Sequence, residues 1–314
     1  MPWNFRKISF DPKMYFGDQV VGYCKSPQIL NLVDLKRVYC CVAVKDNDKL
    51  KSVAIYVDFD SSFRKIIGIS DLGILPDASL GSFDEHGIFP FSPFKFNNKL
   101  IAFTTGWSRR KSVDIDMAVG VVESKDNGCT FERSYGDGPL LAGSLNEPFM
   151  VGDAFVRHFD GQYHMWYIFG NIWLENENGG VERNYKIAHA TSTDMLSWVR
   201  DSMHCFAGDL STCEALPSVA YFEGQYHMVY CSRSTFDFRS DGPTENAYKL
   251  IHAVSENLRD WSIVDSSFAK KYDYFDHHMQ CYPHIFTDNG KMCVIYNGNN
   301  FDLQDFGLLQ WIPK

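Results

Sequence analysis

The sequence lacks the features that mark several classes of protein. Its nine cysteines are scattered and form no CxxC pair, so neither a zinc site nor a disulfide framework is indicated. No run of lysines or arginines interrupts the net charge of −9, which argues against a nucleic-acid partner. No stretch approaches the ~20 apolar residues of a membrane span, and the opening MPWNFRKISFDPKMYF has no apolar signal-peptide core. We therefore expect a cytoplasmic protein with reduced thiols and no membrane span.

Motifs for nucleotide and ester chemistry are also missing. No GxGxxG follows a strand-like run, and neither a GxxxxGK[ST] phosphate loop nor a GxSxG elbow is present. The sequence therefore does not support a dehydrogenase, kinase or esterase, and we expect no cofactor.

Apolar and aromatic residues are plentiful. Hydrophobic residues make up 45% of the chain, charged residues 22% and aromatic residues 15%. This is the balance of a globular protein. Such a chain can bury a large core, and its rings can also line a groove.

The chain contains an internal repeat. Residues 160–167 read DGQYHMWY and residues 223–230 read EGQYHMVY. Three pairs of anchors share a spacing of 63 residues: Gly161 and Gly224, Tyr185 and Tyr248, and Trp198 and Trp261. Further turns followed by apolar runs lie one and two spacings earlier, and another follows with its glycine at 290, so five units account for the chain.

Each unit contains short strand-like runs separated by turns, with little helical periodicity. Four strands per unit, repeated around an axis, predict an all-β, five-bladed β-propeller with four antiparallel strands per blade in a single domain, 1–314. The predicted blades are 21–60, 84–135, 144–203, 210–266 and 273–311. We expect the first residues to close the ring beside the last blade. A pair of β-sandwiches is the alternative, but it does not explain a fivefold period.

Carboxylates recur ahead of the inner strand of several units. Counting back fourteen residues from the turn anchors gives Asp84, Glu147 and Asp276, and Glu214 lies ten before its anchor. Carboxylates held close together raise the pKa values of some of their number. Glycoside cleavage uses a pair of acids of which one is protonated and the other ionised. Alternatively, these acids are solvated loop residues or cap backbone groups.

Several motifs at these spacings resemble those of the five-bladed propeller glycosidase superfamily, which includes glycoside hydrolase families 32, 43, 62, 68 and 130. The motifs are FDEHGIFPFSP, the NEP at 146–148, CEALPSV, SRS at 232–234, CYPHIF and VIYNGNNF. The chain is more narrowly similar to glycosidase-like proteins linked to surface-polysaccharide gene clusters. This resemblance implies a glycoside-bond-processing enzyme, with a carbohydrate, sugar phosphate or nucleotide sugar as substrate.

The resemblance to family 43 implies one carboxylate from each of the first three blades. Asp84 matches the second-blade position, and Glu147 or Glu214 is the expected acid. The first-blade position departs from the pattern, because CKSPQIL has Lys25 and Ser26 where an aspartate is expected. Three readings stay open: Asp84 or Glu85 serves as base; phosphate or a sugar acceptor replaces water, as in a phosphorylase or transferase; or the propeller binds carbohydrate without cleaving it.

Other residues are predicted to contact the substrate. Arg233 would clamp a carboxylate or phosphate, or else pair with a neighbouring acid. A metal site at Asp276, His277 and His278 is conceivable, but the spacing is generic and we predict no metal. The predicted substrate-binding residues are Glu85, His86, Trp107, Asp153, Trp173, Arg233, Asp276, His277 and His278.

Two further features concern the loops and the repeated histidines. The segments 171–183 and 234–247 are predicted to be long loops that shape the site. Phe236 and Phe238, in the second segment, are candidates for stacking on sugar rings. His164, His189, His227 and His252 recur at the 63-residue spacing inside strands, which favours a repeated packing position over a catalytic role.

Overall fold

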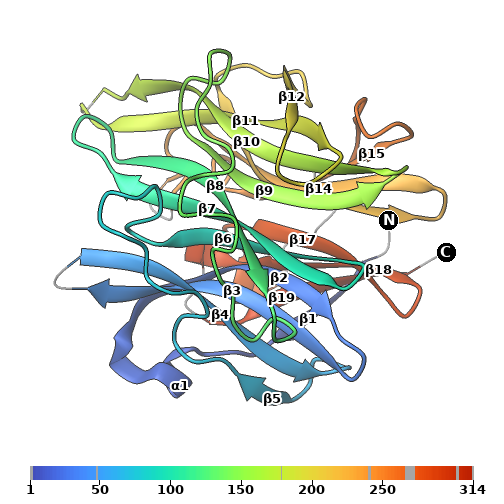
Figure 1. Ribbon diagram of the computed structural model, residues 1–314. Helices are drawn as coiled ribbons and strands as arrows, with labels where there is room; N and C mark the ends of the chain where they lie inside the picture. Colours follow the sequence, from blue (N-terminus) through green and yellow to red (C-terminus); the bar gives the residue numbers. More distant parts are fainter. Residues whose placement is uncertain are drawn as a thin grey trace.

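A computed structural model shows a protein built almost entirely from β-strands (Figure 1). The structure describes residues 3–46, 49–177, 179–239, 242–265, 273–301 and 304–312. Within these ranges the helices are single turns: α1 (Lys13–Phe16), α2 (Asp273–Asp276), and the 3-10 turns η1 (Gly17–Gln19) and η2 (Asn299–Phe301). No described helix is long and apolar enough to cross a membrane. The all-β prediction is therefore confirmed.

Five antiparallel sheets form the five blades of a propeller (Figure 1). The first blade contains β2 (Val20–Asn31), β3 (Leu35–Asp46), β4 (Lys49–Asp60) and β5 (Ile66–Ile69). The second contains β6 (Ile88–Phe96), β7 (Lys99–Arg109) and β8 (Ile115–Ser124). The third contains β9 (Val151–Phe159), β10 (Gln162–Glu175), β11 (Val181–Ser192) and β12 (Val199–His204). The fourth contains β13 (Thr212–Phe222), β14 (Gln225–Ser234), β15 (Lys249–Ser255) and β16 (Ser262–Asp265).

The fifth blade joins the two ends of the chain. It contains β17 (Cys281–Asp288), β18 (Lys291–Asn297) and β19 (Phe306–Trp311), and its fourth strand is β1 (Trp3–Ile8). Trp3 pairs with Trp311 and Ile8 with Phe306. The pairing covers an edge of β19 that would otherwise be open. The predicted closure of the ring by the first residues is confirmed.

Two details of the predicted blades need correction. The outermost strand of the first blade, β5, lies beyond residue 60, where that blade was expected to end. The second blade has a sheet of three strands rather than four in the described part of the chain. In place of a fourth strand, the described residues beyond β8 form two isolated β-bridges with it, Glu132 with Glu123 and Leu141 with Val119. The segment between these bridges contains Gly136, Gly138 and Pro139, residues that disfavour a continuous strand.

The repeat corresponds to the hairpin between the first two strands of a blade. Asp160 and Gly161 both have positive φ (49° and 80°), as do Glu223 and Gly224 (48° and 84°). Two central residues of positive φ define the tight hairpin turn whose twist matches that of the strands, and glycine adopts this conformation without strain. The two repeated motifs are therefore the same turn followed by the second strand of a blade.

The repeated histidines pack against each other in pairs. The rings of His164 and His189 stack with their nearest nitrogens 3.0 Å apart, and so do those of His227 and His252. Burial lowers the pKa of His164 to about 4 and lowers the pKa values of His189 and His227 as well. Neutral rings can share an N–H···N hydrogen bond inside the sheet. The predicted packing role is confirmed.

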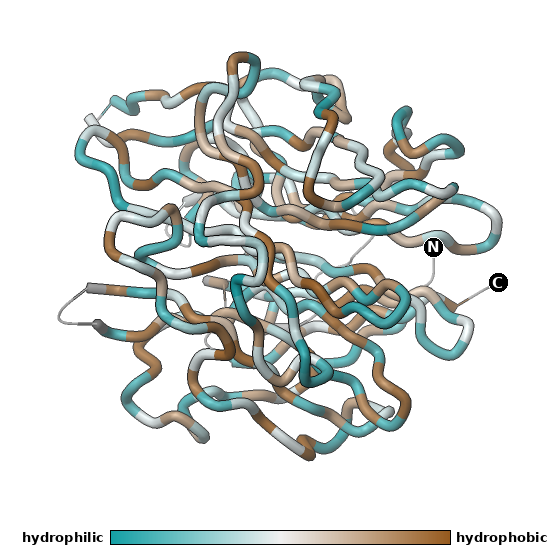
Figure 2. The backbone as a smooth tube through the Cα atoms, viewed as in Figure 1, coloured by the Kyte–Doolittle hydropathy of each residue, from teal (hydrophilic) through white to brown (hydrophobic). Residues whose placement is uncertain are grey.

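The hydrophobic core is divided among the spaces between neighbouring blades. One cluster joins the first and fifth blades, another the first and second, a third the second and third, and the largest joins the third, fourth and fifth. Figure 2 shows hydrophobic residues along the strands and hydrophilic residues at many of the turns. The segment 171–183, predicted as a loop, largely extends β10 and β11 as a hairpin, because its NIWL and VERN runs pair with each other.

Candidate functional site

The innermost strands of the five blades are β2, β6, β9, β13 and β17, and each lies beside the next around the axis. All five are interrupted by a bulge near the same level. Four of the bulges carry a residue of positive φ, namely Ser26, Asp153, Leu216 and Tyr282. Bulges redirect side chains and are frequent beside active sites. The side chains at these bulges are therefore the first place to look for chemistry.

Lys25 directly precedes the bulge of the first blade and lies among aromatic rings. Its Nζ lies 3.6 Å from the ring centre of Tyr23, 4.2 Å from that of Phe89, 5.5 Å from that of Phe301 and 5.9 Å from that of Tyr282. Its Nζ has no hydrogen bond or ion pair within the described part of the chain. Burial, together with the smaller effect of the Arg183 charge, lowers the pKa of Lys25 to about 8. The first-blade position thus holds a cation in place of the aspartate that the resemblance led us to expect.

Asp153 occupies the bulge of the third blade and is 6% exposed. Its Oδ2 accepts a hydrogen bond from the backbone N–H of Leu216 at 3.1 Å. Its Oδ1 makes no hydrogen bond within the described residues. Burial raises the pKa of Asp153 to about 7, although the Leu216 N–H and the charges of Arg183 and Lys25 act in the opposite direction. This carboxyl group can therefore hold or release a proton near neutral pH.

Arg183 completes this group of charges. It lies on β11, opposite Trp173 in the register of β10 and β11, and is half-buried. Its charge acts on both Lys25 and Asp153, and its guanidinium has no carboxylate partner in the ranges that the structure describes. We call Lys25, Asp153 and Arg183 the axial cluster.

Arg233 lies next to this cluster, held by two tyrosines. Its Nε donates to the hydroxyls of Tyr185 (3.2 Å) and Tyr248 (3.1 Å), which lie 2.7 Å apart and are themselves a repeat-related pair. Its guanidinium carbon is 3.6 Å from the ring centre of Phe238, and its buried Nη2 has no hydrogen-bond partner. The salt bridge considered from the sequence does not form with any described residue. Phe238 packs on Arg233 and is buried, so it is closed to a sugar ring.

Asp84 and Glu147 are buried acids with complete sets of partners. Asp84 accepts hydrogen bonds from Ser82 (2.8 Å) and Arg133 (2.7 Å). Glu147 accepts from Tyr167 (2.6 Å) and Arg200 (2.7 Å). Both oxygens of each carboxylate are therefore engaged by the scaffold.

Asp276 occupies the same blade position as Glu147. Its Oδ2 accepts from Gln280 (2.6 Å) and from Tyr296 (2.8 Å), and Tyr296 follows it by twenty residues, as Tyr167 follows Glu147. At two of the three positions that share the offset, Glu147 and Asp276, the acid thus binds the tyrosine of the second strand, whereas Asp84 binds Ser82 and Arg133.

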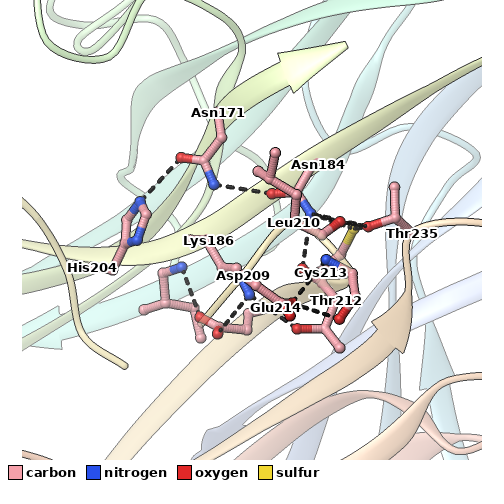
Figure 3. Close-up of polar contacts among 12 residues, drawn as sticks. Asn171, Asn184, Lys186, His204, Asp209, Leu210, Thr212, Cys213, Glu214 and Thr235 are labelled. Carbon is pink, nitrogen blue, oxygen red and sulfur yellow. Dashed lines mark hydrogen bonds and ion pairs between the residues drawn. The ribbon is translucent and has the colours of Figure 1, made fainter. Parts of the chain in front are cut away.

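Glu214 lies on β13, two residues before the bulge at Leu216. Its Oε1 accepts from Lys186 Nζ at 3.3 Å and its Oε2 from the backbone N–H of Ile187 at 3.2 Å (Figure 3). Burial raises the pKa of Glu214, although Lys186 acts in the opposite direction. Figure 3 places this pair beside the polar network of Asn171 and Asn184. Asp84, Glu147 and Glu214 are each held by a separate cation, and their catalytic assignment stays a prediction.

The second-blade candidates form a small cluster of their own. His86 Nδ1 lies 3.4 Å from a carboxylate oxygen of Glu85, and its ring packs on that of Trp107 with centres 5.5 Å apart. Trp107 donates from Nε1 to Ser52 Oγ at 2.6 Å, which fixes the indole against the first blade. Arg109 lies 4.9 Å from the Trp107 ring. These residues are brought together at the entry of the second blade.

The two histidines after α2 have separate partners. His277 Nδ1 lies 2.9 Å from Asn299 Nδ2, and His278 Nδ1 lies 3.2 Å from Thr244 Oγ1. Asp276 contacts Gln280 and Tyr296 instead. No cluster of three or more His, Cys, Asp or Glu residues suited to a metal ion occurs within the described ranges.

Trp173 links the axial region to a large groove. It lines a cavity of about 590 Å³ between the second and third blades, together with Phe149, Arg110 and Asp116. Cavities of this size accommodate small sugars and similar ligands. On the neighbouring strand, Trp173 lies opposite Arg183, which belongs to the axial cluster.

Sequence reasoning missed Arg183 and the tyrosines around Arg233, and it recorded Lys25 only as a departure. One signal was available for the tyrosines, because Tyr185 and Tyr248 were already anchors of the repeat. No comparable signal marks Arg183, whose place beside Lys25 and Asp153 depends on packing between blades.

Comparisons with known proteins agree on the fold. No protein-family model matches the chain. It is 26% identical over 279 residues to the uncharacterized protein MT1551 of Mycobacterium tuberculosis (strain CDC 1551 / Oshkosh), covering 88% of this chain and 87% of that protein. The structure is similar to one titled "Glycoside hydrolase" (TM-score 0.72, 15% identity, 98% of this chain and 91% of that one). It is also similar to an endo-arabinase from Bacteroides thetaiotaomicron VPI-5482 (TM-score 0.63, 14% identity, 94% and 96%).

A third similar structure is described as belonging to the GH130 family of mannoside phosphorylases, with glycoside hydrolases that target β-1,2 mannosidic linkages in Candida mannan (TM-score 0.63, 12% identity, 94% of this chain and 86% of that one). The chain therefore has the five-bladed propeller fold that glycoside hydrolases and phosphorylases use. Fold alone does not fix function, so the activity must be argued from the site.

Proposed function

We propose that this protein is a glycoside-processing enzyme and that Asp153 exchanges the proton with the glycosidic oxygen. The observation that carries the proposal is the state of this carboxyl group: it is buried at the bulge of an inner strand, its Oδ1 is unbonded within the described residues, and its pKa is raised to about 7. Glycosidases use one carboxyl group that stays protonated near neutral pH as their general acid. The propeller fold of known glycosidases supports this choice.

In this proposal, protonated Asp153 gives its proton to the leaving oxygen as the bond to the sugar carbon breaks. A positioned general acid contributes typically about 10²–10⁴-fold to a rate. The second carboxyl group that we propose for the reaction is Glu214, because burial raises its pKa and it lies two residues from the backbone group that binds Asp153. Asp84 and Glu147 are proposed only as further candidates, since both oxygens of each are already bonded.

Hydrolysis, phosphorolysis and glycosyl transfer differ in the molecule that attacks the sugar carbon. Hydrolysis needs a group that activates water, and Lys25 and Ser26 supply no carboxylate at the first-blade position. Phosphate is already ionised and would need no such base, and the positive charges of Lys25 and Arg183 favour it as the attacking group. A sugar acceptor would need a base as water does, because its hydroxyl must lose a proton. A carbohydrate-binding propeller without turnover is the non-enzymatic alternative, and the assay below distinguishes it.

The test is a product assay on aryl glycosides and oligosaccharides, with and without phosphate. Asp153→Asn should lower kcat by about 100-fold or more, since it removes a general acid. Because protonated Asp153 is the active form, kcat/KM of the native protein should fall as the pH rises above about 7. Asp137→Asn, at an exposed loop acid, is the matched control and should leave kcat unchanged.

Two results would contradict the proposal. Turnover that survives in Asp153→Asn would remove Asp153 from the chemistry, and the same assay on Glu214→Gln and Asp84→Asn would show whether either acid replaces it. Binding of oligosaccharides without turnover at any pH would favour the carbohydrate-binding alternative.

A further inference from the structure

The basic side chains of this protein differ in whether they have a carboxylate partner. Several in the scaffold do, as in Arg37 with Asp58, Arg133 with Asp84 and Lys186 with Glu214. The axial side chains Lys25 and Arg183 have none in the part of the chain that the structure describes. Lys25 and Arg183 are only partly exposed. A charge that is partly withdrawn from water is costly unless it is paired, so this difference in partners calls for an explanation.

The positive charge extends beyond the axial cluster. Arg233, 1% exposed, lies between Tyr185 and Tyr248 with its Nη2 unsatisfied. Tyr248 lies 5.8 Å from Tyr282 between ring centres, and Tyr282 belongs to the set of rings around Lys25. Arg157, further along β9, has a backbone carbonyl and His284 as its polar partners and no described carboxylate. A region of positive charge therefore surrounds the axis of a chain whose net charge is −9.

The aromatic rings around Lys25 do not replace a counter-ion. Cation–π contacts stabilise an ammonium group only modestly compared with the cost of withdrawing its charge from water, and burial lowers the pKa of Lys25 to about 8. Asp153 is the carboxyl group that acts electrostatically on Lys25. Its own raised pKa leaves it only partly ionised at neutral pH, so it neutralises at most part of two positive charges.

A neutral sugar would not correct this imbalance. Its hydroxyls can accept hydrogen bonds, but the sugar would displace water from Lys25 and Arg183 without supplying negative charge. A phosphate group offers up to two negative charges and three acceptor oxygens. A guanidinium can bind two of those oxygens side by side, while an ammonium acts as a compact charge, so Arg183 and Lys25 are complementary partners for one phosphate.

We propose that the axial cluster binds a phosphate group between Lys25 and Arg183, carried either by the sugar substrate or by free inorganic phosphate. This inference rests on the proposed function and narrows its substrate class from carbohydrates in general to phosphorylated sugars or to sugars processed together with phosphate. The phosphate would lie beside Asp153, where its negative charge favours the protonated form of that acid.

The test is isothermal titration of the full chain with three probes: inorganic phosphate, glucose 6-phosphate and glucose. Preference for glucose 6-phosphate over both other probes would assign the phosphate to the sugar. Binding of inorganic phosphate at least as tight as that of glucose 6-phosphate would assign it to the free ion. Binding of neither phosphate compound would overturn the proposal.

Variants separate a built site from a surface effect. Arg183→Gln and Lys25→Gln should each weaken phosphate binding by about 10-fold, the loss expected from one charge-assisted hydrogen bond. Lys99→Gln, at the exposed start of β7, is the matched control and should bind as the native protein does. Equal binding by all three variants would identify an adventitious ion only and would overturn the proposal. Since Lys25 is enclosed by rings, half-buried Arg183 provides the variant that is less demanding for folding.

A fourth variant separates this inference from the proposed function. Asp153→Asn removes the proposed general acid but keeps both cations, so it should retain phosphate binding while losing turnover. Retained turnover with normal phosphate binding would contradict only the role of Asp153. Turnover that requires Asp153 in a protein that binds no phosphate would contradict only the phosphate site.

Discussion

The scaffold acids and the axial cluster differ in whether their charged groups have partners. Glu147 is fully buried, and both of its oxygens are bonded, to Arg200 and Tyr167. Asp153 is almost as deeply buried, yet one backbone N–H is its single hydrogen-bond donor among the described residues, and the cations near it have no other acid. The first arrangement lowers the energy of the folded protein, whereas the second leaves charges unsatisfied. Unsatisfied charge at the centre of a rigid propeller is what a binding or catalytic site requires.

The largest effect on stability should come from breaking a scaffold pair. Arg200→Met would leave Glu147 buried with only Tyr167 as partner, so we expect the free energy of unfolding to fall by about 3 kcal/mol or more. Urea unfolding at neutral pH measures this loss. Arg259→Met is the control, because Arg259 is exposed and its contact with Asp201 is long (3.9 Å), so we expect a change within about 0.5 kcal/mol. Equal losses in the two variants would mean that the buried pair is no more important than a surface one.

A smaller effect of opposite sign is expected at the axis. The pKa of Asp153 is raised from 3.8 to about 7, so well below pH 3.8 the group is protonated whether or not the chain is folded and has no effect. Between pH 4 and 7 the unfolded chain ionises first, and the folded protein loses stability that it does not regain at higher pH. Asp153→Asn should therefore raise the free energy of unfolding by roughly 2–4 kcal/mol at pH 8.

The same variant should change stability little at pH 4, and urea unfolding at the two pH values measures the contrast. A loss of stability at pH 8 in Asp153→Asn would show that the carboxylate stabilises the folded protein, as the scaffold acids do, and would remove the distinction between the two regions.

The fold could be predicted from the sequence because the repeat includes the residues that form its hairpin turn. Asp160 with Gly161 and Glu223 with Gly224 form the same hairpin turn, and the 63-residue spacing then gives five blades. The spacing also located Glu147 and Asp276 at one blade position. It could not show that a tyrosine twenty residues later satisfies each of them, because that contact crosses from the segment before the inner strand to the second strand.

The axial cluster was harder to predict for a different reason. Asp153 lies at a bulge, and no sequence pattern indicates that bulge. Lys25 and Arg183 come from different blades, and they approach Asp153 only in the folded ring. The missing first-blade aspartate was visible in the sequence. Its consequence, a cation facing the one acid at the axis, is a property of the folded ring.

Carbon NMR measures the protonation of the Asp153 carboxyl group directly. The chain would be labelled at the aspartate side-chain carboxyl carbons and titrated from pH 4 to pH 9, with Asp153→Asn used to assign the resonance. We expect a midpoint of about 7 for Asp153. A midpoint near 4, the value of an ordinary solvated aspartate, would contradict it.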